Sequence, residues 1–89
     1  MPRRREPQPA LGHVIYGRRK ELGLSQETVA LAAGTDQARM SRIETAGDNP
    51  SLASFERIAD ALELEPWELL KRVREHQAQE EAAAAAHRR

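Results

Sequence analysis

The segment SQETVALAAGTDQARMSRIE, residues 25–44, decides the fold, because its pattern predicts two short helices joined by a tight turn. Ser25 is a favourable N-cap for a helix over residues 26–33, and Asp36 is one for a helix over residues 37–44. So short a turn makes the two helix axes cross steeply. Ala30 allows the close approach, and Gly34 tolerates the positive φ that the reversal favours.

Three further helices are expected around this pair. The first covers residues 10–22, the fourth begins after Ser51 as its N-cap, and the fifth opens at Pro66. Apolar residues at helical spacing are the expected core. On the first four helices they are Leu11, Val14, Ile15, Leu22, Val29, Ala33, Met40, Ile43, Leu52, Phe55, Ile58, Ala59 and Leu62. The fifth helix supplies the apolar positions Trp67, Leu69, Leu70 and Val73, which one helix cannot all turn into the core. The fold class is therefore all-α, with five helices and an extended last helix.

The chain divides into three parts. Residues 1–9, MPRRREPQP, hold three Pro and three Arg, and we expect a disordered arm. Residues 10–73 form the single folded domain. Residues 74–89 are a polar, Ala-rich tail without an apolar face, which continues the fifth helix or frays.

Composition excludes several function classes. The chain contains no Cys, and its three His have no partners at ligand spacing, so we expect no disulfide, no metal and no cofactor. The sequence contains no Gly-rich phosphate-binding loop and no Ser with a plausible base and orienter, so we do not expect an enzyme. The sequence shows no membrane-length apolar run and no signal region, which favours a cytoplasmic protein.

The zero net charge conceals an uneven distribution. Residues 1–43 carry eight basic and four acidic side chains. Residues 44–70 carry one basic and seven acidic side chains, and residues 71–89 carry five basic and three acidic ones. A basic half can attract a polyanion even when the total charge is zero. A nucleic-acid assignment must nevertheless rest on geometry, because the total charge does not support it.

Residues 11–70 resemble the Xre-type, lambda-repressor-like helix-turn-helix family. The resemblance lies in the blocks GLSQ (23–26), VALAAG (29–34), MSRIE (40–44), NPSL (49–52) and IADALEL (58–64). It implies a five-helix domain that binds double-stranded DNA, usually as a homodimer, and regulates transcription. The sequence departs from the family pattern at Ala46 and Glu63, where Gly is common, and at Thr45, where Arg is frequent. These departures bear on loop geometry and on one phosphate contact.

In such a domain the third helix enters the major groove and reads bases with its N-terminal half. The resemblance assigns base reading to Gln37, Ala38 and Arg42. Glutamine matches adenine, arginine matches guanine and alanine matches a thymine methyl group. Arg39 and Ser41 reach either bases or phosphates. The alternative is that these side chains form only a solvated helix surface.

The resemblance also implies supporting roles. Gln26 opens the second helix and is a candidate phosphate contact, as are Asn49 and Ser51 before the fourth helix. Loop and capping duty explain Asn49 and Ser51 equally well. The resemblance further implies that Arg19 pairs with Glu44 and fixes the first helix against the third. The alternative is that Arg19 joins a basic patch with Arg18 and Lys20.

Trp67, Leu70 and Val73 are candidates for a homodimer interface, although at least two apolar residues of the fifth helix must cover the domain's own core. The preferred function is a sequence-specific transcription regulator, a repressor or autoregulator, that binds an inverted-repeat operator as a homodimer. A restriction–modification controller is a close variant. The alternative is an antitoxin or adaptor whose C-terminal tail binds a protein partner.

Overall fold

The computed structural model describes residues 8–87, which form five α-helices. These are α1 (Pro9–Leu22), α2 (Gln26–Ala32), α3 (Gln37–Thr45), α4 (Leu52–Ala61) and α5 (Pro66–His87). Each agrees closely with its predicted position. Most of the expected arm over residues 1–9 lies outside the described residues, and its last residue, Pro9, already begins α1.

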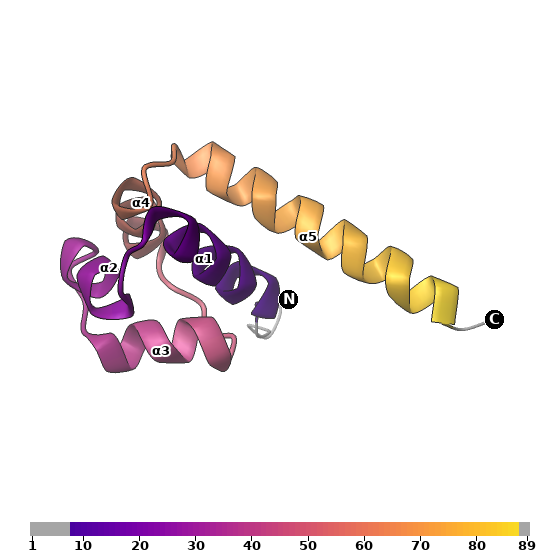
Figure 1. Cartoon of the computed structure of the whole chain (residues 1–89), viewed down its shortest axis with the longest axis horizontal. Helices are drawn as coiled ribbons and strands as arrows, with labels where there is room; N and C mark the ends of the chain where they lie inside the picture. Colours follow the sequence, from indigo (N-terminus) through magenta and orange to yellow (C-terminus); the bar gives the residue numbers. More distant parts are fainter. Residues whose placement is uncertain (1–7, 88–89) are drawn as a thin grey trace, which may run out of the picture.

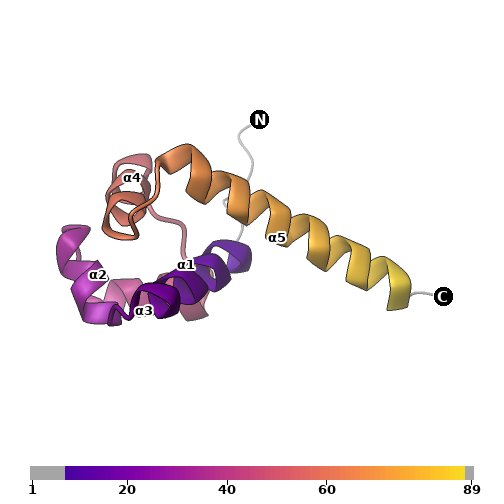
Figure 2. The same cartoon turned by 45° about the horizontal axis from the view of Figure 1, so that its top comes forward.

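The first four helices form a compact body from which α5 projects (Figure 1). Within the body, α3 packs against α1 and α2, and α2 also packs against α4; α5 packs against α1 and α4. The turned view in Figure 2 shows α5 leaving the body along its whole C-terminal half. Residues 78–87 of this helix are exposed. Among residues 8–87, no helix combines the length and hydropathy needed to cross a membrane.

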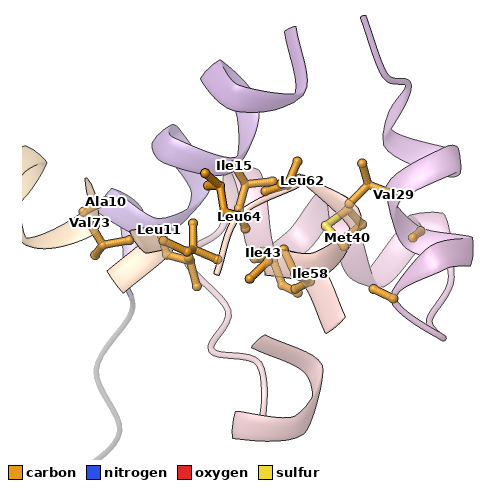
Figure 3. Close-up of a cluster of buried hydrophobic side chains, with 14 residues drawn as sticks. Ala10, Leu11, Ile15, Val29, Met40, Ile43, Ile58, Leu62, Leu64 and Val73 are labelled. Atoms are coloured by element: carbon orange, nitrogen blue, oxygen red, sulfur yellow. The ribbon is translucent and has the colours of Figure 1, made fainter. Parts of the chain in front are cut away.

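Side chains from all five helices converge in one apolar core (Figure 3). Ile15, Met40 and Leu62 are fully buried at its centre. Val14 and Phe55 pack only partly against it. The prediction for Leu52 was wrong: this first residue of α4 is 75 % exposed. Leu52 instead lines an open groove with Phe55, because the start of α4 extends beyond the packed part of the core.

The apolar residues of α5 divide between the core and the surface. Leu69 and Val73 are 0 % and 6 % exposed, whereas Trp67 and Leu70 are 64 % and 48 % exposed. Val73 was predicted to lie in a dimer interface, but it packs in the domain's own core and has little surface left for a partner. Trp67 and Leu70 remain available.

Two small residues permit close helix packing. Ala30 is fully buried on the inner side of α2, as its spacing predicts. Gly12 was not singled out by the sequence pattern, yet α1 crosses the end of α3 at this residue. A Cβ atom at Gly12 would lie 2.5 Å from the carbonyl oxygen of Glu44 and 2.6 Å from that of Ile43. The crossing of α1 over α3 therefore requires glycine.

Candidate nucleic-acid interface

The short helices α2 and α3 are held in place by their caps and by buried side chains. The Ser25 hydroxyl accepts a hydrogen bond from the Thr28 N–H at 3.0 Å, and an Asp36 carboxylate oxygen accepts one from the Arg39 N–H at 2.7 Å. Gly34 adopts a φ of 73° in the turn between the helices, as expected. These local bonds satisfy N–H groups that a helix start leaves without a partner inside the helix.

Helix α3 has one buried face and one open face. Met40 and Ile43 are 0 % and 2 % exposed, so they fix the rotation of the helix against the core. Gln37, Ala38 and Arg42 are exposed on the rest of its surface. The structure thus places these three proposed base readers together on one accessible helix.

Arg42 already has a partner in the isolated protein. Its Nε donates to a carboxylate oxygen of Asp48 at 3.2 Å, in an ion pair whose side chains are 55 % and 41 % exposed. Asp48 belongs to the segment that joins α3 to α4. Sequence reasoning did not select Asp48, because an acidic residue in a polar loop is ordinary.

Arg39 and Ser41 are less accessible than Arg42. The Arg39 guanidinium donates from Nη2 to the backbone carbonyl of Asn49 at 3.1 Å, so this side chain lies against the α3–α4 loop. Its Nε is buried without a hydrogen-bond partner. Ser41 is half-buried, and its carbonyl accepts a hydrogen bond from the Thr45 hydroxyl. In the isolated protein Arg39 therefore braces the loop.

Arg19, Glu44 and Gln26 form a connected group on α1, α3 and α2. Two guanidinium nitrogens of Arg19 bind the two Glu44 oxygens at 3.0 and 2.9 Å, and Gln26 donates from Nε2 to one of these oxygens at 3.2 Å. The hydrogen bond to Glu44 raises the pKa of Arg19, which burial alone would lower. The paired guanidinium holds α1 against the end of α3.

The other candidate phosphate contacts lie at the start of α4. The Ser51 hydroxyl accepts a hydrogen bond from the Ser54 N–H at 3.1 Å and acts as the N-cap. The Asn49 carbonyl receives Arg39. Both residues thus carry out the loop and capping duties that were the alternative to phosphate binding. Within residues 8–87, the His, Asp and Glu side chains form no group of three that could hold a metal ion.

Comparison with known proteins identifies the fold and the family. Residues 15–69 match the Helix-turn-helix family. The restriction-modification controller protein C.AhdI from Aeromonas hydrophila is 35 % identical, over 70 % of this chain and 94 % of C.AhdI, with a TM-score of 0.66. No curated protein matches the sequence significantly.

Two more distant structures share the fold. The clp gene regulator ClgR from Corynebacterium glutamicum matches with a TM-score of 0.85 and 20 % identity, over 91 % of this chain and 86 % of ClgR. C.Esp1396I bound to a 25 base pair operator site matches with a TM-score of 0.74 and 24 % identity, over 84 % and 99 %. On the family match and the identity with C.AhdI, the chain belongs to the Xre-type, lambda-repressor-like helix-turn-helix family of DNA-binding transcription regulators.

Proposed function

We propose that this protein is a sequence-specific repressor or autoregulator that binds an inverted-repeat operator in double-stranded DNA as a homodimer. One observation carries the proposal. Helix α3 buries Met40 and Ile43 and leaves Gln37 and Arg42 exposed on an accessible face. A helix so held can enter a major groove without disturbing the core.

The exposed side chains have the chemistry of base readers. The Gln37 amide both donates and accepts, which suits the N7 and N6 positions of adenine. The Arg42 fork suits O6 and N7 of guanine, and the Ala38 methyl group suits the methyl group of thymine. Arg39 and Ser41 take secondary positions, because Arg39 binds the loop and Ser41 is half-buried.

Gln26, Asn49 and Ser51 are proposed as phosphate contacts that fix the register of the protein on DNA. Gln26 and Ser51 have protein partners in the isolated chain, Glu44 and Ser54. To contact DNA, each side chain must therefore bind a phosphate oxygen in addition to this protein partner. For Gln26 this is feasible, because its amide carries two N–H donors and the bond to Glu44 uses one of them.

The homodimer rests on the exposed apolar surface of α5. Trp67 and Leu70 lie three residues apart and are therefore neighbours on the helix surface. Leu70 also lines the groove that contains Leu52 and Phe55. A second copy related by two-fold symmetry would cover this surface and present two α3 helices. Such a dimer needs half-sites about one DNA turn apart, roughly 10 base pairs.

Two relatives support the regulatory role. C.AhdI is a restriction-modification controller, and C.Esp1396I, which shares the fold, binds a 25 base pair operator site. A controller of this kind acts on DNA in its own compartment, which we expect to be the cytoplasm.

The test begins with selection of binding sites from a random duplex pool, followed by sequencing. We expect one recurrent inverted repeat, with half-site spacing that reports the dimer. The Gln37→Ala, Arg42→Ala double variant should then lose most of the preference for the selected site over random duplex. The matched control is the Lys71→Ala, Gln79→Ala double variant, which removes one charge and one amide from exposed positions of α5. If both double variants bind the selected site as tightly as wild type, α3 does not read its sequence.

The antitoxin or adaptor alternative has one favourable observation. Residues 78–87 continue α5 away from the body and are exposed on all sides (Figure 1). This surface contains mainly Ala and Glu, so it offers little apolar area to a protein partner. We therefore keep DNA binding by the domain as the primary function.

A further inference from the structure

The segment between α3 and α4 returns to contact the helix it has just left. The Ala46 and Asp48 N–H groups both donate to the Arg42 carbonyl, at 2.8 and 3.3 Å. Gly47 adopts a φ of 73°, which lets the chain reverse between them. The same glycine accepts a hydrogen bond from the Gln8 N–H at 2.8 Å. The position of Asp48 is therefore set by backbone bonds on both sides of the turn.

This turn brings the Asp48 carboxylate to one particular edge of Arg42. The carboxylate accepts from Nε at 3.2 Å. A guanidinium carries five N–H donors in a planar fork, and only one of them lies on Nε. The two terminal nitrogens, Nη1 and Nη2, carry the other four. Asp48 therefore holds the guanidinium from the side and leaves its end available.

The free end of the guanidinium is the part that recognises guanine. Two parallel N–H donors on one edge of an arginine can bind O6 and N7 together. With Nε occupied, only the end formed by Nη1 and Nη2 can make this pair of bonds. We propose that Asp48 is a positioning residue that orients Arg42 for end-on reading of one guanine, an inference that rests on the proposed DNA-binding function.

Asp48 has a second effect through its charge. Its side chain is 41 % exposed beside the reading helix, so bound DNA brings phosphates towards a carboxylate. A carboxylate opposes the counterion-release attraction that drives non-specific binding. Orientation of Arg42 strengthens specific binding, whereas repulsion weakens non-specific binding. Both effects increase the ratio of specific to non-specific affinity.

The test uses the full chain and the operator selected from the random pool. The Arg42→Ala variant first locates the guanine that Arg42 reads. At that base pair, substitution in the operator no longer lowers the affinity of the variant, although it lowers the affinity of the wild type. Discrimination is then the ratio of affinities for the selected operator and for the same duplex with that pair changed to A·T. We expect Asp48→Ala to reduce this ratio about three- to tenfold, a part of what one bidentate pair contributes. Discrimination at other base pairs should stay unchanged.

Three further variants separate orientation from charge. Asp48→Asn keeps an acceptor oxygen for Nε, so it should retain most of the discrimination while non-specific affinity rises. Asp48→Ala in an Arg42→Ala background should cause no further loss of discrimination. Asp60→Ala removes the same charge from an exposed position near the C-terminal end of α4 and should leave discrimination unchanged.

The possible outcomes distinguish failure of the proposed DNA-binding function from failure of the proposed role of Asp48. If the pool yields no preferred sequence, the proposed function fails. If Arg42→Ala loses discrimination but Asp48→Ala keeps it, only the role of Asp48 is overturned. If Asp48→Ala binds the selected operator more tightly with its base preference intact, Asp48 only repels phosphates and does not position Arg42.

Discussion

Arg19 of α1 and Glu44 of α3 form a bidentate ion pair that is almost completely buried. The two N···O distances are 3.0 and 2.9 Å, and the side chains are only 8 % and 4 % exposed. Gln26 of α2 adds a third contact to the same carboxylate. One carboxylate therefore joins α1 to α2 and α3, the helices that carry Gln26 and the proposed base readers.

Removal of this carboxylate should destabilise the fold strongly. Glu44→Ala leaves the Arg19 guanidinium buried and unpaired, which costs about 3–5 kcal/mol in comparable cases. The free energy of unfolding, from urea titration followed by circular dichroism, measures the loss. Arg42→Asn is the matched control, because it breaks an ion pair whose side chains are 55 % and 41 % exposed. Exposed pairs contribute about 0–1 kcal/mol. Equal losses for the two variants would contradict a structural role for the buried pair.

Substitution by alanine at Gly12 and at Gly17, both on α1, should change the stability of the fold in opposite directions. Gly12→Ala places a methyl group about 2.5 Å from backbone oxygens of α3, so the two helices must move apart. We expect a loss of several kcal/mol or failure to fold, as for severe overpacking. Gly17 is exposed and a Cβ there meets nothing within 4 Å. Gly17→Ala should therefore stabilise α1 by up to about 1 kcal/mol through helix propensity. Thermal unfolding of both variants tests the pair, and a stable Gly12→Ala protein contradicts the close crossing.

These glycines show which parts of the fold the sequence could predict. The N-caps Ser25, Asp36 and Ser51 each bind the N–H group three residues further on, so local patterns placed three of the five helices correctly. Gly12 matters because of a contact with α3, which is distant along the chain. Nothing in the local pattern of α1 distinguishes it from Gly17.

Replacement of Glu63 by glycine, which the family often carries at this position, should stabilise the fold. Its φ is 59°, a left-handed conformation that costs a residue with a Cβ about 1–2 kcal/mol. Glu63→Gly removes this strain but increases the entropy of the unfolded chain, so we expect a net gain of about 0.5–1 kcal/mol. Gly23→Ala is the reverse control, because Gly23 has a φ of 68° and open space around it. Its melting temperature should fall as that of Glu63→Gly rises, and a fall for both would contradict this account.

The candidate site could be predicted only in part: its helix positions were foreseen, whereas the contacts made by the loop after α3 were not. Helical spacing predicted that Met40 and Ile43 point inward, and both are buried. Family resemblance, and not periodicity, selected Gln37, Ala38 and Arg42, which are exposed. The pairing of Arg19 with Glu44 came from family resemblance and is present. The partners of Arg39 and Arg42 could not be foreseen, because they depend on how Gly47 turns the loop back onto α3.

The proposed dimer predicts that polar substitution on α5 separates the two copies. Leu70→Asp places a charge in the apolar groove and should weaken self-association at least tenfold, measured by analytical ultracentrifugation. Its affinity for a single half-site should be retained, while cooperative binding to the full operator is lost. Leu31→Asp is the control, because Leu31 is 70 % exposed on α2, away from the groove. A Leu70→Asp variant that self-associates like wild type would place the dimer interface elsewhere.

Removal of the projecting end of α5 tests what that end contributes. A chain that stops after Gln77 keeps the hydrogen bond from Gln77 Nε2 to Gln8 Oε1 and every buried residue of α5. Among the described residues, it loses only the exposed residues 78–87 and with them the ion pair of His76 with Glu80. We therefore expect unfolding free energy within about 0.5 kcal/mol of the full chain and unchanged operator affinity. The antitoxin or adaptor alternative makes a different prediction, namely that a purified protein partner binds the full chain and not the shortened one. Operator affinity that falls with truncation would instead show that the end of α5 contributes to the DNA-bound assembly, because the body alone keeps every proposed contact with DNA.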